Sequence, residues 1–277
     1  MIGGNNRMTC VVNKELGMRL ENSEIDTLWS RLTAIQEING NPMGVEIQNF
    51  GDATAFSVTN IPGPSFNTVK GLTANDEKYV KDIIRFYNEK EIPVRFELTP
   101  AHVSSDLLTY LNELGFYQLD FHTSLFKVTD SMVSEEKVEP QISIRELEED
   151  EFDTFAEIYT NGFQMPSFLK SGVAQNNKIL HNNPNWTFYL ASIDNVPAGV
   201  GVLFIKDRIA TLAAAATLPS LRKKGIQSAL IKKRIQQASL EQCDLIAGQA
   251  KFGSTSQMNM EKAGMKIAYT KAIWVKK

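Results

Sequence analysis

The stretch TLPSLRKKGIQSAL, residues 217–230, carries the strongest signal in the chain. It follows an apolar run of small residues, Ile209 to Ala216, and leads into an amphipathic segment, so it predicts a strand, a basic loop and the start of a helix. The first N–H groups of a helix lack intrahelical partners and carry the positive end of the helix dipole, which favours phosphate. Gly225 has no Cβ and lets a ligand approach the backbone. The sequence therefore predicts a pyrophosphate site at this turn.

The segments after the loop follow in a regular order. Apolar residues at helical spacing predict a helix, with Lys232, Lys233 and Arg234 expected mostly to face water. A short apolar run (245–250) predicts a strand, and a helix ended by Gly264 and a last strand (267–275) follow. The apolar residues that predict the first of these helices are Ile226, Leu230, Ile235 and Ala238.

The spacing Arg222-x-x-Gly225-x-Gln227 after an extended strand, with this order of elements and the ending Glu261-Lys262-x-Gly264, resembles the GNAT superfamily of N-acetyltransferases. An exposed basic turn with a glycine for chain reversal is the alternative for the loop taken alone. The resemblance covers residues 142–277 and implies acetyl-CoA as acyl donor. It places the donor on the strand end and the loop, which are Ala215, Ala216, Thr217, Arg222, Lys223, Lys224, Gly225, Ile226, Gln227 and Ser228.

Composition limits the class of protein. With 277 residues, 43% of them hydrophobic, the chain can bury one large or two ordinary cores. A net charge of −3 and local rather than extended basic character argue against a nucleic-acid binder. No apolar run is long enough to span a membrane and no signal-peptide core is present, so we expect a cytoplasmic protein without a membrane partner.

The two cysteines predict neither a disulfide nor a metal site. Cys10 and Cys243 lie far apart and without metal-ligand spacing, so we expect reduced thiols and no metal. The sequence leaves the oligomeric state open between monomer and homodimer.

An acidic, polar stretch closed by Pro140 divides the chain nearly in half. We therefore expect a domain at 1–128, a linker at 129–141 and the catalytic domain at 142–277. The fold class is α/β (α+β), with two GNAT-like domains that each have a mixed, mostly antiparallel central sheet flanked by helices.

The front half looks like a second copy. Residues 110–115 and the strand through Phe126 parallel residues 260–264 and the strand through Trp274. Duplication is the interpretation, and convergence on a common helix–glycine–strand unit is the alternative. The expected upstream elements are a helix at 26–38, strands at 45–50 and 53–58, a helix at 75–87 and a strand at 94–98.

The two copies differ in their chemistry. Where the front copy needs a basic loop it has residues 69–77, VKGLTANDE, whose acids would repel pyrophosphate. We expect residues 1–128 to lack a phosphate loop and to brace or shape the substrate cleft.

One position departs from the family pattern. Many members carry a tyrosine just before Glu-Lys-x-Gly as general acid for the CoA thiolate, but this chain has Met260, whose thioether cannot donate a proton. The candidate catalytic residues are Tyr269, Ser256 and Asn259, with a water or an unassisted thiolate as alternatives. Each has a structural reading: a core aromatic for Tyr269, a helix cap for Ser256 and a solvated helix position for Asn259.

The acceptor side is less defined. A general base and an aromatic wall for the acceptor pocket are expected in the helical region of the second half. For each candidate residue, simple exposure or core packing is the alternative. The candidates there are Glu157, Tyr159, His181, Phe163, Phe168 and Trp186.

The resemblance implies an N-acetyltransferase that moves an acetyl group from acetyl-CoA to a primary amine of a small molecule or peptide, by direct attack in a ternary complex. The alternative is a non-catalytic CoA-binding regulatory module, motivated by Met260 and the degenerate front half. Aminoacyl or other acyl transfer by a tandem GNAT-like protein is a weaker third.

Overall fold

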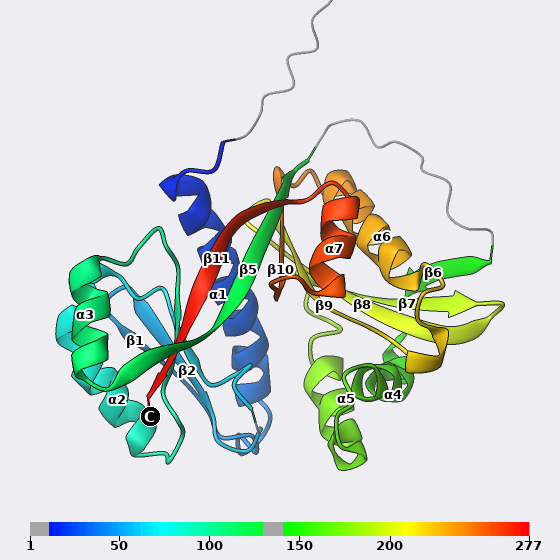
Figure 1. Cartoon of the computed structure of the whole chain (residues 1–277). Helices are drawn as coiled ribbons and strands as arrows, with labels where there is room; N and C mark the ends of the chain where they lie inside the picture. The colour runs from blue at the N-terminus through cyan, green and yellow to red at the C-terminus, as the bar shows by residue number, and fades with distance from the viewer. Residues whose placement is uncertain (1–10, 62, 130–140, 277) are drawn as a thin grey trace, which may run out of the picture.

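One continuous β-sheet joins the two halves of the chain in the computed structural model (Figure 1). The structure describes residues 11–61, 63–129 and 141–276. Eleven strands of this part of the chain pair in the order β1-β2-β3-β4-β11-β5-β10-β9-β8-β7-β6.

The first half of the chain supplies one long helix and the first five strands. Its elements are α1 (Lys14–Gln36), β1 (Val45–Phe50), β2 (Ala53–Val58), β3 (Thr68–Lys70), the 3₁₀ turn η1 (Ala74–Tyr79), α2 (Val80–Asn88), β4 (Arg95–Leu98), α3 (Ser105–Glu113) and β5 (Phe116–Val128).

The second half repeats this order, after an extra edge strand. Its elements are β6 (Ile142–Glu146), η2 (Glu149–Glu151), α4 (Phe152–Gly162), η3 (Ser167–Leu169), α5 (Lys170–Lys178), β7 (Trp186–Ile193), β8 (Val196–Lys206), β9 (Ile209–Thr217), η4 (Pro219–Leu221), α6 (Ile226–Leu240), β10 (Leu245–Lys251), α7 (Thr255–Lys262) and β11 (Lys266–Lys276).

The predicted fold class is confirmed, and the two halves share their order of elements. In each half, three antiparallel strands are followed by a helix, a strand parallel to the third, a short helix and a long last strand. Gly115 and Gly264 end the equivalent helices α3 and α7 with similar positive φ angles of 87° and 85°.

The last strand of each half completes the sheet of the other half. β5 lies antiparallel to β10, with Leu125 opposite Gly248. β11 lies antiparallel to β4, with Trp274 opposite Phe96. β5 and β11 also pair with each other, and Figure 1 shows them side by side between the two lobes. The division into residues 1–128 and 142–277 stays a prediction about folding units, because the sheet is continuous across it; most of the predicted linker lies outside the described residues.

Helix α1 is longer than the sequence predicts. It begins at Lys14, twelve residues before the predicted start at Asp26, and Asn13 caps it by accepting a hydrogen bond from the Leu16 N–H (2.9 Å). Apolar periodicity missed this part because the helix buries two acids there, Glu21 and Glu24. The strand β3, only three residues long, was also not predicted.

Four charged side chains form a buried cluster beneath α1. The Lys70 ammonium group contacts the carboxylates of Glu97 (2.5 Å) and Glu24 (3.2 Å). The Lys271 ammonium group, from β11, contacts Glu97 (2.9 Å) and also Glu24. Ser124 of β5 donates its hydroxyl to Glu24 (2.8 Å). The cluster therefore joins α1, β3 and β4 of the first half to the last strand of the second.

Attraction to the ammonium groups keeps the carboxylates of this cluster ionised. Burial alone would raise the pKa of Glu24 and Glu97, but the ammonium groups of Lys271 and Lys70 outweigh it, so both pKa values lie below their usual range, that of Glu97 well below. Burial alone would lower the pKa of Lys271, whereas the two carboxylates raise it overall. Glu24, Glu97 and Lys271 are thus held in their ionised forms at neutral pH by their neighbours.

Three observations concern the membrane, metal and disulfide predictions made from the sequence. No helix among residues 11–61, 63–129 and 141–276 is both long and apolar enough to cross a membrane. The same part of the chain holds no group of three or more His, Cys, Asp or Glu side chains arranged for a metal ion. Cys243 is a free, buried thiol, and Cys10 lies outside the described residues.

We predict that Lys271→Met lowers the free energy of unfolding by about 3–5 kcal/mol, because it leaves two buried carboxylates with one cation. The folded-state pKa of Glu24 and Glu97 rises in the variant. Since carboxylates with lowered pKa stabilise the fold above their unfolded pKa and lose that effect as pH falls, the acid unfolding midpoint moves to higher pH. Urea denaturation at several pH values measures both effects.

Lys266→Met is the matched control, because Lys266 is an exposed lysine on the same strand. Equal stability of the two variants at neutral pH would contradict a stabilising role for the cluster.

Candidate functional site

Strands β9 and β10 diverge after their first three residues. They pair in parallel through three positions only, ending at Thr211 opposite Ala247. β9 continues to Thr217 and β10 to Lys251 without further pairing between them. On the side away from β8, β9 beyond Thr211 therefore pairs with no strand of the described part of the chain, and this opening leads to the loop that the sequence singles out.

A β-bulge starts the divergence. Val202 of β8 lies opposite Ala214 while Leu203 lies opposite Leu212, so Ala213 is the extra residue on β9. An extra residue bends its strand and locally increases its twist. The bulge thus gives a physical reason why β9 leaves β10 at this point.

The guanidinium group of Arg234 holds the bulge from the α6 side. It donates hydrogen bonds to the backbone carbonyls of Val202 (3.2 Å) and Ala214 (3.0 Å) and to Leu230 in its own helix (3.0 Å). Only 1% of Arg234 is exposed, and burial lowers its pKa to about 10, which leaves it charged at neutral pH. The prediction that Arg234 mostly faces water was wrong, because Gly201 leaves space for its side chain over the sheet.

The backbone of β9 turns alternate N–H groups toward the opening. The Leu218 N–H donates to the Ala198 carbonyl of β8 (2.9 Å). Since successive residues of an antiparallel strand face opposite edges, Ala216 and Ala214 face β8, whereas Ala215 and Thr217 face away from it. Two of the three strand residues assigned to the donor, Ala215 and Thr217, therefore present N–H groups at the unpaired edge.

Helix α6 begins directly after the loop with its first turn uncapped. Gly225 occupies the N-cap position with φ +84°, and no side chain caps the helix there. Among the described residues, no hydrogen-bond acceptor is recorded for the N–H groups of Gly225, Ile226, Gln227 and Ser228. Such a helix start attracts anions through its free N–H groups and its dipole.

The basic residues of the loop divide into two kinds. Lys223 and Lys224 are exposed. The Arg222 guanidinium group instead donates to the carbonyl of Gly162 at the end of α4 (2.6 Å). Gly162 is itself tightly placed, since a Cβ there would lie 2.8 Å from the Cβ of Ala216. This contact ties the loop to the end of α4, so it favours a role for Arg222 in locking the loop rather than in touching phosphate.

The equivalent place in the first half is filled by the protein's own side chains. β3 and β4 pair in parallel at one position, Val69 opposite Phe96, and the ion pair of Lys70 and Glu97 lies directly beyond it. The following helix start is capped by Thr73, whose hydroxyl accepts from the Asn75 N–H (3.2 Å). The Asp76 carboxylate accepts from the N–H groups of Thr73 (2.9 Å) and Asp52 (3.0 Å). This arrangement supports the prediction that residues 1–128 bind no CoA.

Comparison with known proteins identifies the second half. The family model described as the acetyltransferase (GNAT) family matches residues 144–252. The chain therefore carries a GNAT acetyltransferase domain over residues 144–252. The match supports an acyltransferase, and in general terms an N-acetyltransferase, and the family generally uses acetyl-CoA. It includes the β9–β10 opening and the uncapped start of α6.

Solved structures show the GNAT fold over both halves. A GCN5-related N-acetyltransferase from Kribbella flavida is 12% identical with a TM-score of 0.67, covering 94% of this chain and 95% of that chain. One from Sphaerobacter thermophilus is 12% identical with a TM-score of 0.60, covering 91% and 92%. A tandem GNAT protein from the clavulanic acid biosynthesis pathway is 9% identical with a TM-score of 0.60, covering 92% and 95%. No curated protein matches the chain.

The candidate catalytic residues of the second half lie on two faces of the sheet. Tyr269 packs in the cluster beneath α1, with Leu245 and Ala247 of β10. Ser256 and Asn259 lie on α7, which covers the opposite face through Met260. The structure therefore does not bring Tyr269 together with the other two.

Their local surroundings also differ. Burial raises the pKa of the Tyr269 phenol, which makes it a weaker acid. The cap of α7 is Ser254, which accepts from the Gln257 N–H (3.3 Å), so Ser256 is not the cap residue. Ser256 and Asn259 are both partly buried.

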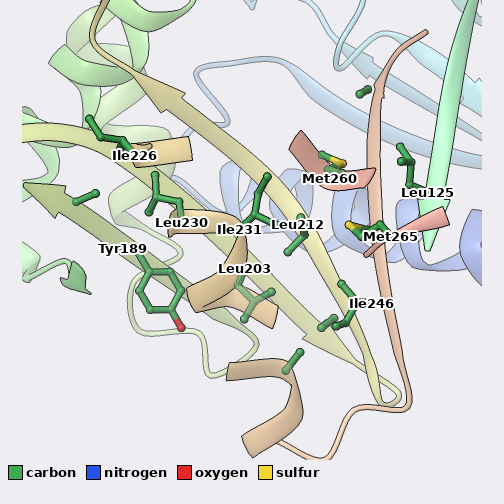
Figure 2. Close-up of a cluster of buried hydrophobic side chains, with 14 of the residues drawn as sticks. Leu125, Tyr189, Leu203, Leu212, Ile226, Leu230, Ile231, Ile246, Met260 and Met265 are labelled. Atoms are coloured by element: carbon green, nitrogen blue, oxygen red, sulfur yellow. The ribbon is translucent and has the colours of Figure 1, made fainter. Parts of the chain in front are cut away.

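Met260 fills the core instead of a proton-donating position. It is 5% exposed, and a Cβ added to Gly248 would meet its sulfur at 3.0 Å. Figure 2 shows Met260 in the buried cluster, near Met265 and Leu125. Met260, which stands where many family members have a tyrosine, is thus a packing residue in this chain.

The candidates for the acceptor side are scattered. Trp186 is buried and donates its indole N–H to Ser30 of α1 (2.9 Å), so it joins the two halves rather than lining a pocket. The Glu157 carboxylate pairs with Lys170 (2.8 Å), and His181 packs edge-on to Phe152.

The aromatic residues at the end of α4 form a small stack. Tyr159 lies between Phe155 and Phe163, with ring centroids 5.6 and 4.7 Å away, and burial raises the pKa of Tyr159. Phe163 and Phe168 are 51% and 76% exposed. They remain available near the loop, whereas Trp186 does not.

We predict that Arg234→Met lowers the free energy of unfolding by about 1–3 kcal/mol, because the carbonyls at the bulge lose a charged donor in a buried place. Urea denaturation measures the change. Gln236→Met, an exposed position on the same helix, is the control and is expected to stay within about 0.5 kcal/mol of the parent protein. A loss for Arg234→Met no larger than that of the control would argue against a supporting role.

Proposed function

We propose that the chain is an N-acetyltransferase that transfers an acetyl group from acetyl-CoA to a primary amine of a small molecule or peptide. The observation that carries this proposal is the uncapped, glycine-led start of α6 at the end of a strand whose edge is unpaired. A phosphate-binding helix start and an open strand edge are adjacent, as a donor with a pyrophosphate and an extended arm requires.

The residues of the loop hold the pyrophosphate in this proposal. The N–H groups of Gly225 to Ser228 donate to the phosphate oxygens, and Lys223 and Lys224 add charge. Gly225 supplies both the left-handed turn and the open approach, since a Cβ there would meet only Ile142, at 3.5 Å. Arg222 fixes the loop on the end of α4.

The open edge of β9 positions and polarises the acyl group. When bound, acetyl-CoA supplies the acetyl group as a thioester. The N–H groups of Ala215 and Thr217 are the backbone donors that can hold the donor's arm and carbonyl. The Ala214 carbonyl accepts from the charged Arg234, and the same peptide group carries the Ala215 N–H, so the cation strengthens that N–H as a donor.

Most of the rate enhancement comes from holding the two reactants in the correct relative position. Holding the amine and the thioester carbon in contact replaces a collision between two molecules in water. The leaving thiolate takes a proton from Ser256 on the α7 side, from Tyr269 on the α1 side or from water, or it leaves unassisted. Asn259 can contribute only a hydrogen bond to it. The alternative function, a CoA-binding regulatory module, keeps the loop and lacks turnover.

We predict that Gly225→Asp abolishes CoA binding while Gly225→Asn retains most of it. The two side chains have nearly the same size, and Asn tolerates a positive φ, so only Asp places an added negative charge against the phosphates. Calorimetric titration with CoA gives the affinities, and thermal unfolding confirms that both variants are folded. Equal CoA affinity in the two variants would remove the loop from the donor site.

We predict that the protein releases CoA from acetyl-CoA only when a suitable amine is present. A thiol reagent follows CoA release, and mass spectrometry identifies the acetylated product. Folded protein that binds CoA but shows no acceptor-dependent release across an amine panel would instead support the module. Gly225→Asp supplies the background rate.

A further inference from the structure

A cavity lies between helix α1 of the first half and the β8–β9 hairpin of the second. Its volume is about 230 Å³. One wall is the polar side of α1, including Arg19 and Asp26, and the other is formed by the hairpin from Lys206 to Thr211. In Figure 1 α1 runs across the sheet behind β5 and β11. Neither half encloses this cavity alone.

The cavity reaches the point where the donor's strands diverge. Thr211 lines it and is also the last residue of β9 that pairs with β10. The Thr211 residue is 4% exposed, and its hydroxyl oxygen has no hydrogen-bond partner among the described residues. A buried hydroxyl without a partner is costly, so it is a ready contact for a polar ligand.

The lining carries both signs of charge. The Lys206 ammonium group pairs with the Asp26 carboxylate across the cavity wall (2.5 Å), and Arg19 pairs with Asp244 (2.8 Å). Asp207 adds a second carboxylate to the lining. These side chains are partly exposed, at 43% and 30% for Lys206 and Asp26, so a ligand can exchange with the present pairs.

Size and charge together restrict the ligand. Pockets for drug-sized molecules measure roughly 300–1,000 Å³, so this cavity suits a smaller molecule. The lining holds two cations, Arg19 and Lys206, beside two carboxylates, Asp26 and Asp207, so it has no excess of negative charge to bind a polycationic amine. A molecule with one ammonium and one carboxylate group can satisfy both kinds of wall residue.

We propose that this cavity is the acceptor site and that the acceptor is a small zwitterionic amine, a free amino acid or one of similar size. Asp26 holds the ammonium group, and Lys206 and Arg19 hold the carboxylate. This inference rests on the proposed acetyl transfer, and it makes α1 of the non-binding half the determinant of acceptor specificity.

The proton balance follows from this placement. The ammonium group loses one proton, through Asp26, to solvent and becomes a neutral amine. The amine nitrogen then forms a bond to the thioester carbon, and the carbon–sulfur bond breaks. The nitrogen's second proton ends on the leaving thiolate, so the products are the N-acetylated amine, CoA thiol and one proton.

The test compares matched acceptors and matched variants in the full-length protein. Each amino acid is assayed beside its carboxamide, which keeps the amine and removes the negative charge. We expect kcat/KM for the amino acid to exceed that for the amide by about 10-fold or more, as loss of one charge contact implies. Asp26→Asn is expected to raise KM for the amino acid by a similar factor of about 10 and to leave KM for acetyl-CoA unchanged.

Asp82→Asn is the control, because Asp82 forms an ion pair with Arg85 on the surface of α2, outside the cavity. Calorimetric titration of the amino acids into the protein saturated with CoA adds a readout that needs no turnover. Turnover of other amines, unaffected by Asp26→Asn, would overturn this site while leaving acetyl transfer intact. Asp26-dependent amino-acid binding without any turnover would support the site and refute acetyl transfer, and failure of both readouts would refute both.

Discussion

The arrangement of the whole molecule depends on β5, a strand of the first half that is hydrogen-bonded to two strands of the second. β10 lies on one edge of β5 and β11 on the other. Separating the halves would break three ladders, β4–β11, β11–β5 and β5–β10, and expose the strand edges that they cover, and an exposed edge invites wrong pairing. The halves are therefore parts of one sheet, and α1 is held across the hairpin of the second half. The cavity between them exists because this exchange fixes their relative position.

The two places in this sheet where parallel strands diverge differ in what fills them. In the second half no partner among the described residues is recorded for the N–H groups at the start of α6. In the first half the equivalent space holds Lys70 and Glu97, and the helix start is capped by Thr73, whose own N–H donates to Asp76. A buried ion cluster is a poor source of stability by itself, because desolvation offsets the attraction between the charges. Its clearer role is in specificity, because its opposite charges match α1, β4 and β11 to one another.

The sequence predicted what depends on local chemistry. The glycine-led loop, the helix after it and most of the order of elements followed from periodicity, caps and spacing, although β3 and the start of α1 did not, and the family match covers residues 144–252 of the second half. The exchange of β5 and β11 could not be predicted, since equivalent strands fit either sheet equally well by pattern. The start of α1 was hidden by Glu21 and Glu24, which are polar in sequence but buried through contacts with residues 46 to 247 positions away. Arg234 was misplaced for the same reason, because its partners are backbone carbonyls of other strands.

Donor and acceptor are recognised by different kinds of group, and this explains why only one of them could be assigned from sequence. The proposed donor site is made chiefly of backbone N–H groups within 215–228, where a single glycine and a helix start leave a readable trace. The proposed acceptor site is made of side chains from α1 and from the β8–β9 hairpin, about 180 positions apart. No local pattern links Asp26 to Lys206; only the shared sheet brings them to 2.5 Å. In the proposed arrangement, substitutions in α1 of the first half change the acceptor while the donor site of the second half stays unchanged.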